Sequence, residues 1–315
     1  MDRIVPAVER IRLPKAVLPA GVVAASYTPD VKESRSRLGP SRRDAIERIF
    51  ATRSRPSHRL ALDDIGIDLR FNAPANWSHC VNGHLVLALM LRREIESRNI
   101  HGRLTAILPA NIPRYIIDLF DLFGFASLAT DAPVVGRLCE FQATPHDCIR
   151  AVMCDLIEEA LLDSPVRKAM LDEGRPPPKK LFVSRRDTRK LDNESEIAAL
   201  LEARGYTKVY PETLTVLDQF RYFAHATHIV AVHGAGLAPI AYRPKGAPCR
   251  LVELLSPGHM TNFYRLITHQ TGSRWVGVRG RLPGAHDGPH PLVQTAEPVG
   301  QVVHGYRADA VGDRP

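Results

Sequence analysis

The sequence contains no run of about 18 consecutive apolar residues, which is the length that a membrane-spanning helix requires. Its N-terminal stretch, MDRIVPAVERIRLPK, has charges scattered through it and lacks the continuous apolar core of a secretion signal. With 44% hydrophobic and 24% charged residues, the composition is typical of a globular protein. We therefore expect a cytoplasmic protein, and its 315 residues are enough for two domains of ordinary size.

Cysteine is also scarce. The five cysteines are odd in number, widely spaced and without a CxxC pair, which argues against a disulfide framework and against a zinc site. The histidines near the C-terminus lack the spacing of metal ligands. We expect reduced thiols and no bound metal. The cysteines are Cys80, Cys139, Cys148, Cys154 and Cys249.

Acidic residues are fewer than basic residues, 34 against 42, so the formal net charge is +8. The basic residues are densest at Arg35–Arg43 and Arg185–Lys190 and are not interleaved with aromatic rings, so no nucleic-acid partner is expected. A phosphorylated substrate or an anionic membrane face would also match this charge. Peripheral contact with the inner face of the plasma membrane is therefore a hypothesis for this chain.

The first half of the chain has an α/β pattern of modest regularity. Two apolar runs at 104–108 and 125–129 flank an amphipathic stretch at 113–123, and this sequence of strand, helix and strand makes a βαβ unit. Further strands are expected at 22–25, 59–62, 67–71 and 138–141, and helices at 41–53, 81–98, 149–162 and 165–171. We assign residues 1–172 to a first α/β domain, followed by the proline-rich linker EGRPPPKK at 173–180.

The second half is more regular. Short apolar runs recur every 20 to 25 residues, at 181–184, 208–210, 229–232, 251–255 and 275–278. Helices are expected between them at 193–204 and 216–226, capped by Asn193 and Thr215, then in a short piece after Gly236 and at 261–271. This alternation predicts a parallel, doubly wound sheet in a domain of residues 181–281. Residues 282–315 have little periodicity and are expected to form an irregular tail.

The stretch IVAVHGAGLAPIA, residues 229–241, carries the strongest local signal. A buried strand is followed by His233, Gly234, Ala235 and Gly236, and then by the start of a helix. Glycines allow a ligand to come close to the backbone, and the free N–H groups of a helix start bind anions. The alternative is a tight turn that carries a histidine without a functional role.

Polar residues follow two other strands of the same predicted sheet. Arg185, Arg186 and Arg189 come after the first strand, and arginine offers paired donors for phosphate. Glu253 lies in the fourth strand, where a carboxylate would suit the hydroxyl pair of a ribose. Because ligands of parallel sheets bind outside the carboxyl ends of the strands, these groups together suggest a nucleoside diphosphate. The alternatives are a solvated basic turn and an ion pair between Glu253 and Arg250.

The order of these motifs resembles glycosyltransferase family 61, which is associated with capsular polysaccharide biosynthesis. The resemblance covers about residues 180–256 closely, and Asn76–His79 is similar to an Asn-aromatic-aromatic-His motif of the family's first half. This chain departs from the family pattern at Ser78, where a second aromatic is usual, and at Ala238 and Pro239. The matching residues are Arg185, Arg186, Arg189, Asn193, Glu194, Pro211, Glu212, Gln219, His233–Leu237 and Glu253.

The resemblance implies a GT-B fold, in which two Rossmann-like domains face each other across a cleft. It implies that the first domain holds the acceptor, a glycan or a lipid-linked saccharide, and that the second holds a nucleotide sugar, UDP-linked. Transfer would be inverting and metal-independent, with no cofactor besides this co-substrate. The donor-binding residues would be Arg185, Arg189, Asn193, Gly234, Ala235, Gly236 and Glu253.

A transfer of this kind needs a general base for the acceptor hydroxyl. We favour His79, because histidine titrates near neutral pH, and the alternatives are Asp63, Asp64 and Asp68. His233 is expected to hydrogen-bond the phosphate or the sugar. The alternative functions are a catalytically inactive nucleotide-sugar-binding or scaffold protein and, far less favoured, a nicotinamide-dependent dehydrogenase, for which His233–Leu237 lacks the GxGxxG spacing.

Overall fold

The computed structural model describes residues 10–12, 58–140, 153–172, 174, 176–186, 191–256, 261–280, 293–294, 302–303 and 306–307. The expected strand at 22–25, the expected helix at 41–53, Cys148, Arg189 and most of the C-terminal tail lie outside these residues. The chain divides into two compact units, residues 1–152 and 153–315, which we call the first unit and the second unit. No helix of the described part is long and apolar enough to cross a membrane.

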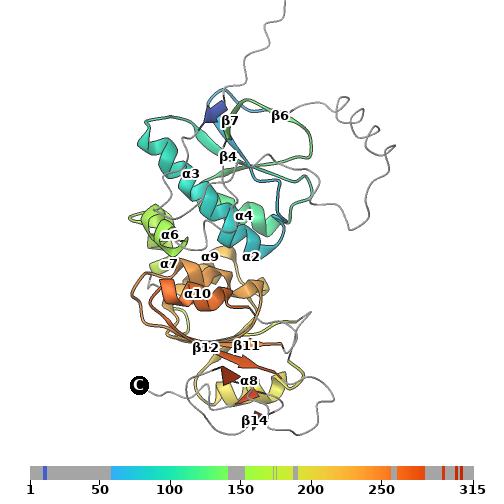
Figure 1. Ribbon diagram of the computed structural model, residues 1–315, viewed down its shortest axis with the longest axis vertical. Coiled ribbons are helices and arrows are strands. Elements are labelled where there is room, and N and C mark those ends of the chain that lie inside the picture. The colour runs from blue at the N-terminus through green and yellow to red at the C-terminus, as the bar shows by residue number, and fades with distance from the viewer. Residues whose placement is uncertain are drawn as a thin grey trace, which may run out of the picture. The chain divides into compact units, whose positions relative to one another are not determined.

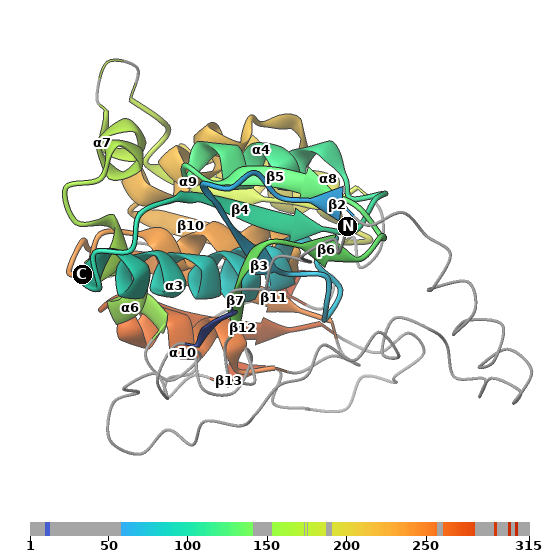
Figure 2. The ribbon, with the colours of Figure 1, turned by 90° about the horizontal axis from the view of Figure 1, so that it is seen from above.

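The first unit contains a five-stranded sheet in which every neighbouring pair is parallel. Its strand order is β1 (Arg10–Arg12), β7 (Arg137–Glu140), β3 (Asp64–Asp68), β4 (Arg103–Leu108) and β5 (Ala126–Ala129). A separate parallel pair is formed by β2 (His58–Arg59) and β6 (Val134–Val135). Helix α4 (Arg114–Leu122) connects β4 to β5, as the predicted βαβ unit requires, and lies along β5 (Figure 2).

The long helix of the first unit begins earlier than expected. It runs through α2 (Trp77–His79), the π-helical turn η1 (Cys80–His84) and α3 (Leu85–Ser97). The side chain of Asn76 caps it, because its oxygen accepts the His79 N–H at 3.3 Å. The stretch Asn76–His79 therefore forms the cap and the first turn of this helix.

The second unit has the predicted doubly wound sheet. Its parallel strands lie in the order β9, β8, β10, β11 and β12, and β13 adds an antiparallel edge. The chain therefore reverses its direction of travel across the sheet between β8 and β10, and such a switch point is where open α/β sheets bind ligands. The strands are β8 (Lys180–Val183), β9 (Thr207–Val209), β10 (His228–Val232), β11 (Arg250–Leu255), β12 (Arg274–Arg279) and β13 (Val293–Gln294).

Helices cover both faces of this sheet, with α8 on one face and α9 and α10 on the other (Figure 1). Phe182, Val230 and Val252 belong to an apolar core in which α8 contributes Ile197 and Leu201. On the other face, α7 packs on α9, and α6 packs on η3 and α10. The segment 153–171, which we assigned to the first domain, is thus part of the second unit. The helices are α6 (Met153–Leu161), α7 (Pro165–Leu171), α8 (Glu194–Glu202), η2 (Pro211–Thr213), α9 (Val216–His225), η3 (Ala235–Tyr242) and α10 (Phe263–Gln270); the short strands β14 (Val302–Val303) and β15 (Tyr306–Arg307) pair separately.

Candidate functional site

The switch point brings two of the predicted site residues together. Strands β8 and β10 pair in parallel, with Val183 opposite Ala231, so the segments that follow them leave the sheet at the same edge. Arg185 follows β8 and His233 follows β10. The Arg185 Nη1 group donates a hydrogen bond of 3.0 Å to the His233 carbonyl oxygen. The guanidinium is therefore fixed at the point where the doubly wound fold binds ligands.

Gly234 is required at this position because it leaves space for Arg185. A Cβ atom on Gly234 would lie 1.8 Å from the Arg185 Nη1 atom and 2.8 Å from Cζ. The φ angle of Gly234 is 163°, which is extended backbone that any residue can adopt. We expected the glycine to bring the backbone close to a ligand; the structure shows that it makes room for a guanidinium.

Directly after Gly234, the chain enters the 3₁₀ helix η3. The Leu237 N–H donates to the Gly234 carbonyl at 3.1 Å, so the helix begins at Ala235 and the N–H groups of Ala235 and Gly236 precede its first internal bond. The N-terminus of a helix carries a partial positive charge. Arg185 and this helix start together form an edge that attracts an anion.

Glu253 lies in the predicted strand, β11, but makes different contacts from those we expected. Its side chain is fully buried, and its Oε1 atom lies 2.5 Å from the His233 Nδ1 atom. The Oε2 atom accepts a 2.7 Å hydrogen bond from the Trp275 indole N–H. Because both oxygens are used inside the protein, neither contact with a ribose nor a pair with Arg250 describes this residue. Glu253 instead fixes the ring of His233.

The contact with Glu253 determines which ring nitrogen of His233 carries the hydrogen. A carboxylate can only accept hydrogen bonds, so the Nδ1 atom of His233 carries the hydrogen and, in the neutral ring, Nε2 carries the lone pair. A histidine held in this way by a carboxylate is oriented for hydrogen bonding or proton transfer through Nε2. His233 is 8% exposed, so the ring is largely buried.

Two aromatic residues that sequence reasoning missed complete this arrangement. The Tyr264 hydroxyl donates to the Gly234 carbonyl at 2.8 Å, and its ring meets the His233 ring edge-on with centroids 5.7 Å apart. The ring of Trp275 lies over Gly277, where a Cβ atom would come within 2.4 Å of Trp275 Cη2. Gly277 thus gives Trp275 the space to reach Glu253.

The remaining residues predicted near Arg185 lie towards β9. Asn193 is at the N-terminus of α8 and is buried, but its side chain does not cap the helix, contrary to our expectation. The Arg186 guanidinium stacks 4.3 Å above the Tyr210 ring. Glu194 pairs with Lys208 and accepts the Tyr210 hydroxyl at 2.8 Å. Burial alone would raise the pKa of Glu194, but the hydrogen bonds from Lys208 and Tyr210 outweigh it and lower the pKa below its ordinary value.

In the first unit, the geometry distinguishes between the candidate bases. The Nδ1 atom of His79 lies 3.3 Å from the Asn72 carbonyl oxygen, and the side chain is partly exposed. Asp64 accepts two hydrogen bonds from Arg103, at 2.8 and 2.9 Å. Asp63 and Asp64 lie at the start of β3, which is the edge opposite to its carboxyl end. These two carboxylates are therefore poorly placed for the chemistry expected at the carboxyl edge.

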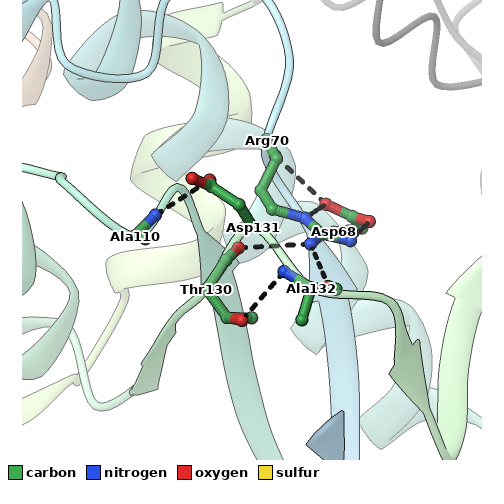
Figure 3. A network of polar contacts seen from close by, with 6 residues as sticks. All are labelled: Asp68, Arg70, Ala110, Thr130, Asp131 and Ala132. Atoms are coloured by element: carbon green, nitrogen blue, oxygen red, sulfur yellow. Dashed lines mark hydrogen bonds and ion pairs between the residues drawn. The ribbon is translucent and has the colours of Figure 1, made fainter. Parts of the chain in front are cut away.

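Asp68 lies at the carboxyl end of β3 but is held in an ion pair. Its two oxygens accept hydrogen bonds of 2.9 and 2.7 Å from the Nε and Nη2 atoms of Arg70 (Figure 3). These bonds raise the pKa of Arg70, in spite of its partial burial. Both oxygens of this carboxylate are therefore engaged by the guanidinium. His79 remains the base that we favour.

No curated protein matches the chain. The sequence model of the family described as Glycosyltransferase 61 matches residues 91–251, which is just over half of the chain. The match includes Arg185 and the His233–Leu237 motif, whereas His79 and Glu253 lie outside it. The chain belongs to glycosyltransferase family 61 and is a glycosyltransferase.

Proposed function

We propose that the second unit binds the diphosphate of a nucleotide sugar, UDP-linked, at the switch point between β8 and β10. Membership of the family implies a sugar donor and an acceptor. The observation that carries this proposal is the Arg185 guanidinium, which packs against Gly234 at the start of η3. A guanidinium and the N–H groups of a helix start are the donors that phosphate oxygens prefer in proteins.

In the proposed reaction, an acceptor hydroxyl attacks the anomeric carbon of the sugar and the bond from that carbon to the diphosphate oxygen breaks. A single displacement of this kind inverts the anomeric centre. Negative charge grows on the departing diphosphate, and Arg185 with the amides of Ala235 and Gly236 would stabilise it without a metal ion. Gly234, Asn193 and Arg189 complete the proposed donor site, with Arg189 outside the described residues.

The proton of the acceptor hydroxyl needs a base, and we assign His79 to this role. A hydrogen on its Nδ1 atom, donated to the Asn72 carbonyl, would leave the lone pair on Nε2. His233, positioned by Glu253, would hydrogen-bond the phosphate or the sugar through Nε2. Within the described part of the chain the buried Glu253 carboxylate hydrogen-bonds only to His233 and Trp275, so Glu253 would act as a positioning residue.

We extend the proposal to the setting of the enzyme. The two units would face each other across a cleft in a GT-B arrangement, and the acceptor would be a glycan or a lipid-linked saccharide of capsular type. The protein would act in the cytoplasm, with peripheral contact to the inner face of the plasma membrane through its +8 charge. Co-sedimentation with phosphatidylserine vesicles would test this contact, and no co-sedimentation even at low salt would contradict it.

Calorimetric titration with UDP and with GDP tests the donor site. We expect UDP to bind the wild-type protein and Arg185→Ala to lose this binding. Arg274→Ala is the matched control, because it removes the same charge from an exposed residue. Arg274 is the first residue of β12 and so lies at the amino edge of the sheet, opposite to the carboxyl edge that holds Arg185. Equal UDP affinity in wild type and Arg185→Ala would overturn the proposal. When UDP binds, NMR analysis of the product formed from UDP-sugars would establish the anomeric outcome.

A further inference from the structure

The carboxyl edge of the first unit's sheet is formed by three loops that hydrogen bonds tie together. The Arg70 Nη1 group, in the loop after β3, donates to the carbonyls of Thr130 and Ala132, at 3.2 and 2.7 Å, in the loop after β5. The Asp131 Oδ1 atom accepts the Ala110 N–H at 3.1 Å and so joins the loops after β5 and β4 (Figure 3). These bonds make the edge a preorganised surface at the position where parallel sheets bind ligands.

An aromatic pair stands at the same edge. Trp77 is in the first turn of α2 and Tyr115 in the first turn of α4, and their rings meet edge-on with centroids 5.9 Å apart. The Tyr115 hydroxyl donates to the Ala75 carbonyl at 2.9 Å, which joins α4 to the loop after β3. Tyr115 nevertheless remains 43% exposed, so part of its ring is open to a ligand.

Asp131 supplies a polar group in the loop after β5, at the same carboxyl edge. It is exposed, and while its Oδ1 atom is held by the Ala110 N–H, its Oδ2 atom has no hydrogen-bond partner within the described part of the chain. The Arg70 guanidinium beside it is occupied by Asp68 and by two carbonyls. With an oriented carboxylate and a guanidinium that is already paired, this edge is poorly suited to an anion and well suited to hydroxyl groups.

We propose that this edge binds a pyranose ring of the acceptor, with its C–H face on the ring of Tyr115 and a hydroxyl donating to Asp131 Oδ2. A pyranose has an apolar C–H face and a rim of hydroxyls, so an exposed aromatic ring and a fixed carboxylate at one edge of the sheet complement both parts. That this sugar is an acceptor rests on the proposed function. The site itself rests on Tyr115, Asp131 and the bonds that hold their loops.

Saturation-transfer NMR on the full chain tests this site, with the methyl β-glycopyranosides of glucose, galactose, mannose and xylose as probes. We expect at least one probe to bind in the presence and in the absence of UDP. Tyr115→Ala and Asp131→Ala should each weaken it at least tenfold. Tyr115→Phe should retain binding, because it keeps the ring and loses only the bond to Ala75.

Asp118→Ala is the control for Asp131→Ala, since Asp118 is a partly exposed carboxylate of the same unit that pairs with Arg114. The proposal is overturned when no glycoside binds the folded protein, or when binding is the same in wild type, Tyr115→Ala and Asp131→Ala. Thermal unfolding of each variant separates loss of the site from loss of the fold, and Tyr115→Phe tests the ring independently. UDP titration reports the donor site separately, so either proposal can fail while the other stands.

Discussion

The two units place different chemistry at the carboxyl edges of their parallel sheets. In both sheets the chain reverses direction between two neighbouring strands, β3 and β7 in the first unit and β8 and β10 in the second. The second unit places a guanidinium and a helix start there, above a buried His233–Glu253 pair. The first unit places an exposed aromatic ring after β4 and a carboxylate after β5, both on one side of its switch point. The fold fixes where a ligand binds, and the loops after the strands decide which ligand it is.

The two edges also differ in how they are held. In the second unit, the side chains behind the edge are buried: Glu253 is fully buried and Tyr264 is 2% exposed. In the first unit, the loops at the edge are joined by side-chain hydrogen bonds of half-buried residues such as Arg70, whose side chain is 22% exposed. Removing a side chain at the edge of the second unit should therefore lower the unfolding free energy more than removing one at the edge of the first unit. Buried polar groups left without partners cost more free energy than solvated ones.

The largest effect is expected for Glu253→Ala. It removes the partner of both His233 and Trp275 inside the protein, and breaking a buried pair of this kind costs about 3 kcal/mol of unfolding free energy. We expect UDP binding to fall as well, because the His233 ring is no longer oriented. Urea unfolding and calorimetry check both results, with Asp131→Ala as the exposed counterpart from the other unit. An unfolding free energy equal to wild type would show that Glu253 does not hold this edge.

Gly234→Ala separates binding from stability. The new Cβ atom would occupy the position of the Arg185 guanidinium, which lies at the end of a flexible side chain and can move away. The backbone of residue 234 is extended, so alanine should change the unfolding free energy by less than about 1 kcal/mol. Displacing one charged donor from the phosphate should weaken UDP binding about 30-fold.

Gly236→Ala is the matched control for this substitution. Its Cβ atom would lie 3.0 Å from Pro211 Cγ, away from the guanidinium, and requires only a small adjustment. We expect its UDP affinity to stay within a few-fold of wild type. If Gly234→Ala and Gly236→Ala weaken UDP binding equally, then the space that Gly234 leaves for Arg185 does not account for the loss.

Arg70→Met tests whether the two edges are independent. The substitution keeps the aliphatic stem but removes the bonds to Asp68, Thr130 and Ala132, and we expect a loss of about 2 kcal/mol confined to the first unit. Hydrogen exchange should accelerate in residues 68–72 and 130–132. UDP affinity should not change. A parallel loss of UDP binding would show that the edge of the first unit supports the donor site.

The sequence predicted the second unit's sheet well because its parallel strands are buried on both faces and appear as continuous apolar runs. It predicted the place of Arg185 and His233 for the same reason, since both directly follow such runs. The role of Glu253 could not be predicted. It depends on the register that places Ala231 and Gly277 on either side of it, and on the space above Gly277 that Trp275 fills.

The sequence predicted less of the first unit. Its βαβ unit was predicted from local pattern, but the expected strand at 67–71 is β3 at Asp64–Asp68, because Arg70 and Asp68 pair at its end. Asp131 was not identified at all, although it follows a predicted strand, because a single aspartate after a strand has no distinctive pattern. Long-range bonds such as that between Ala110 and Asp131 define this edge, and no local signal encodes them.

The smallest effect is a pH dependence next to the donor site, from Glu194. The pKa of Glu194 is lowered in the folded protein, so its ionisation stabilises the fold above the ordinary glutamate pKa of about 4.3. This contribution is lost as the pH falls through the lowered pKa of the folded state. Glu194→Gln lacks the contribution at every pH. The difference in unfolding free energy between wild type and Glu194→Gln should therefore be largest at neutral pH and shrink towards pH 3, as measured by urea unfolding across this range. A difference that stays constant or grows on acidification would mean that the bonds from Lys208 and Tyr210 do not favour the ionised carboxylate.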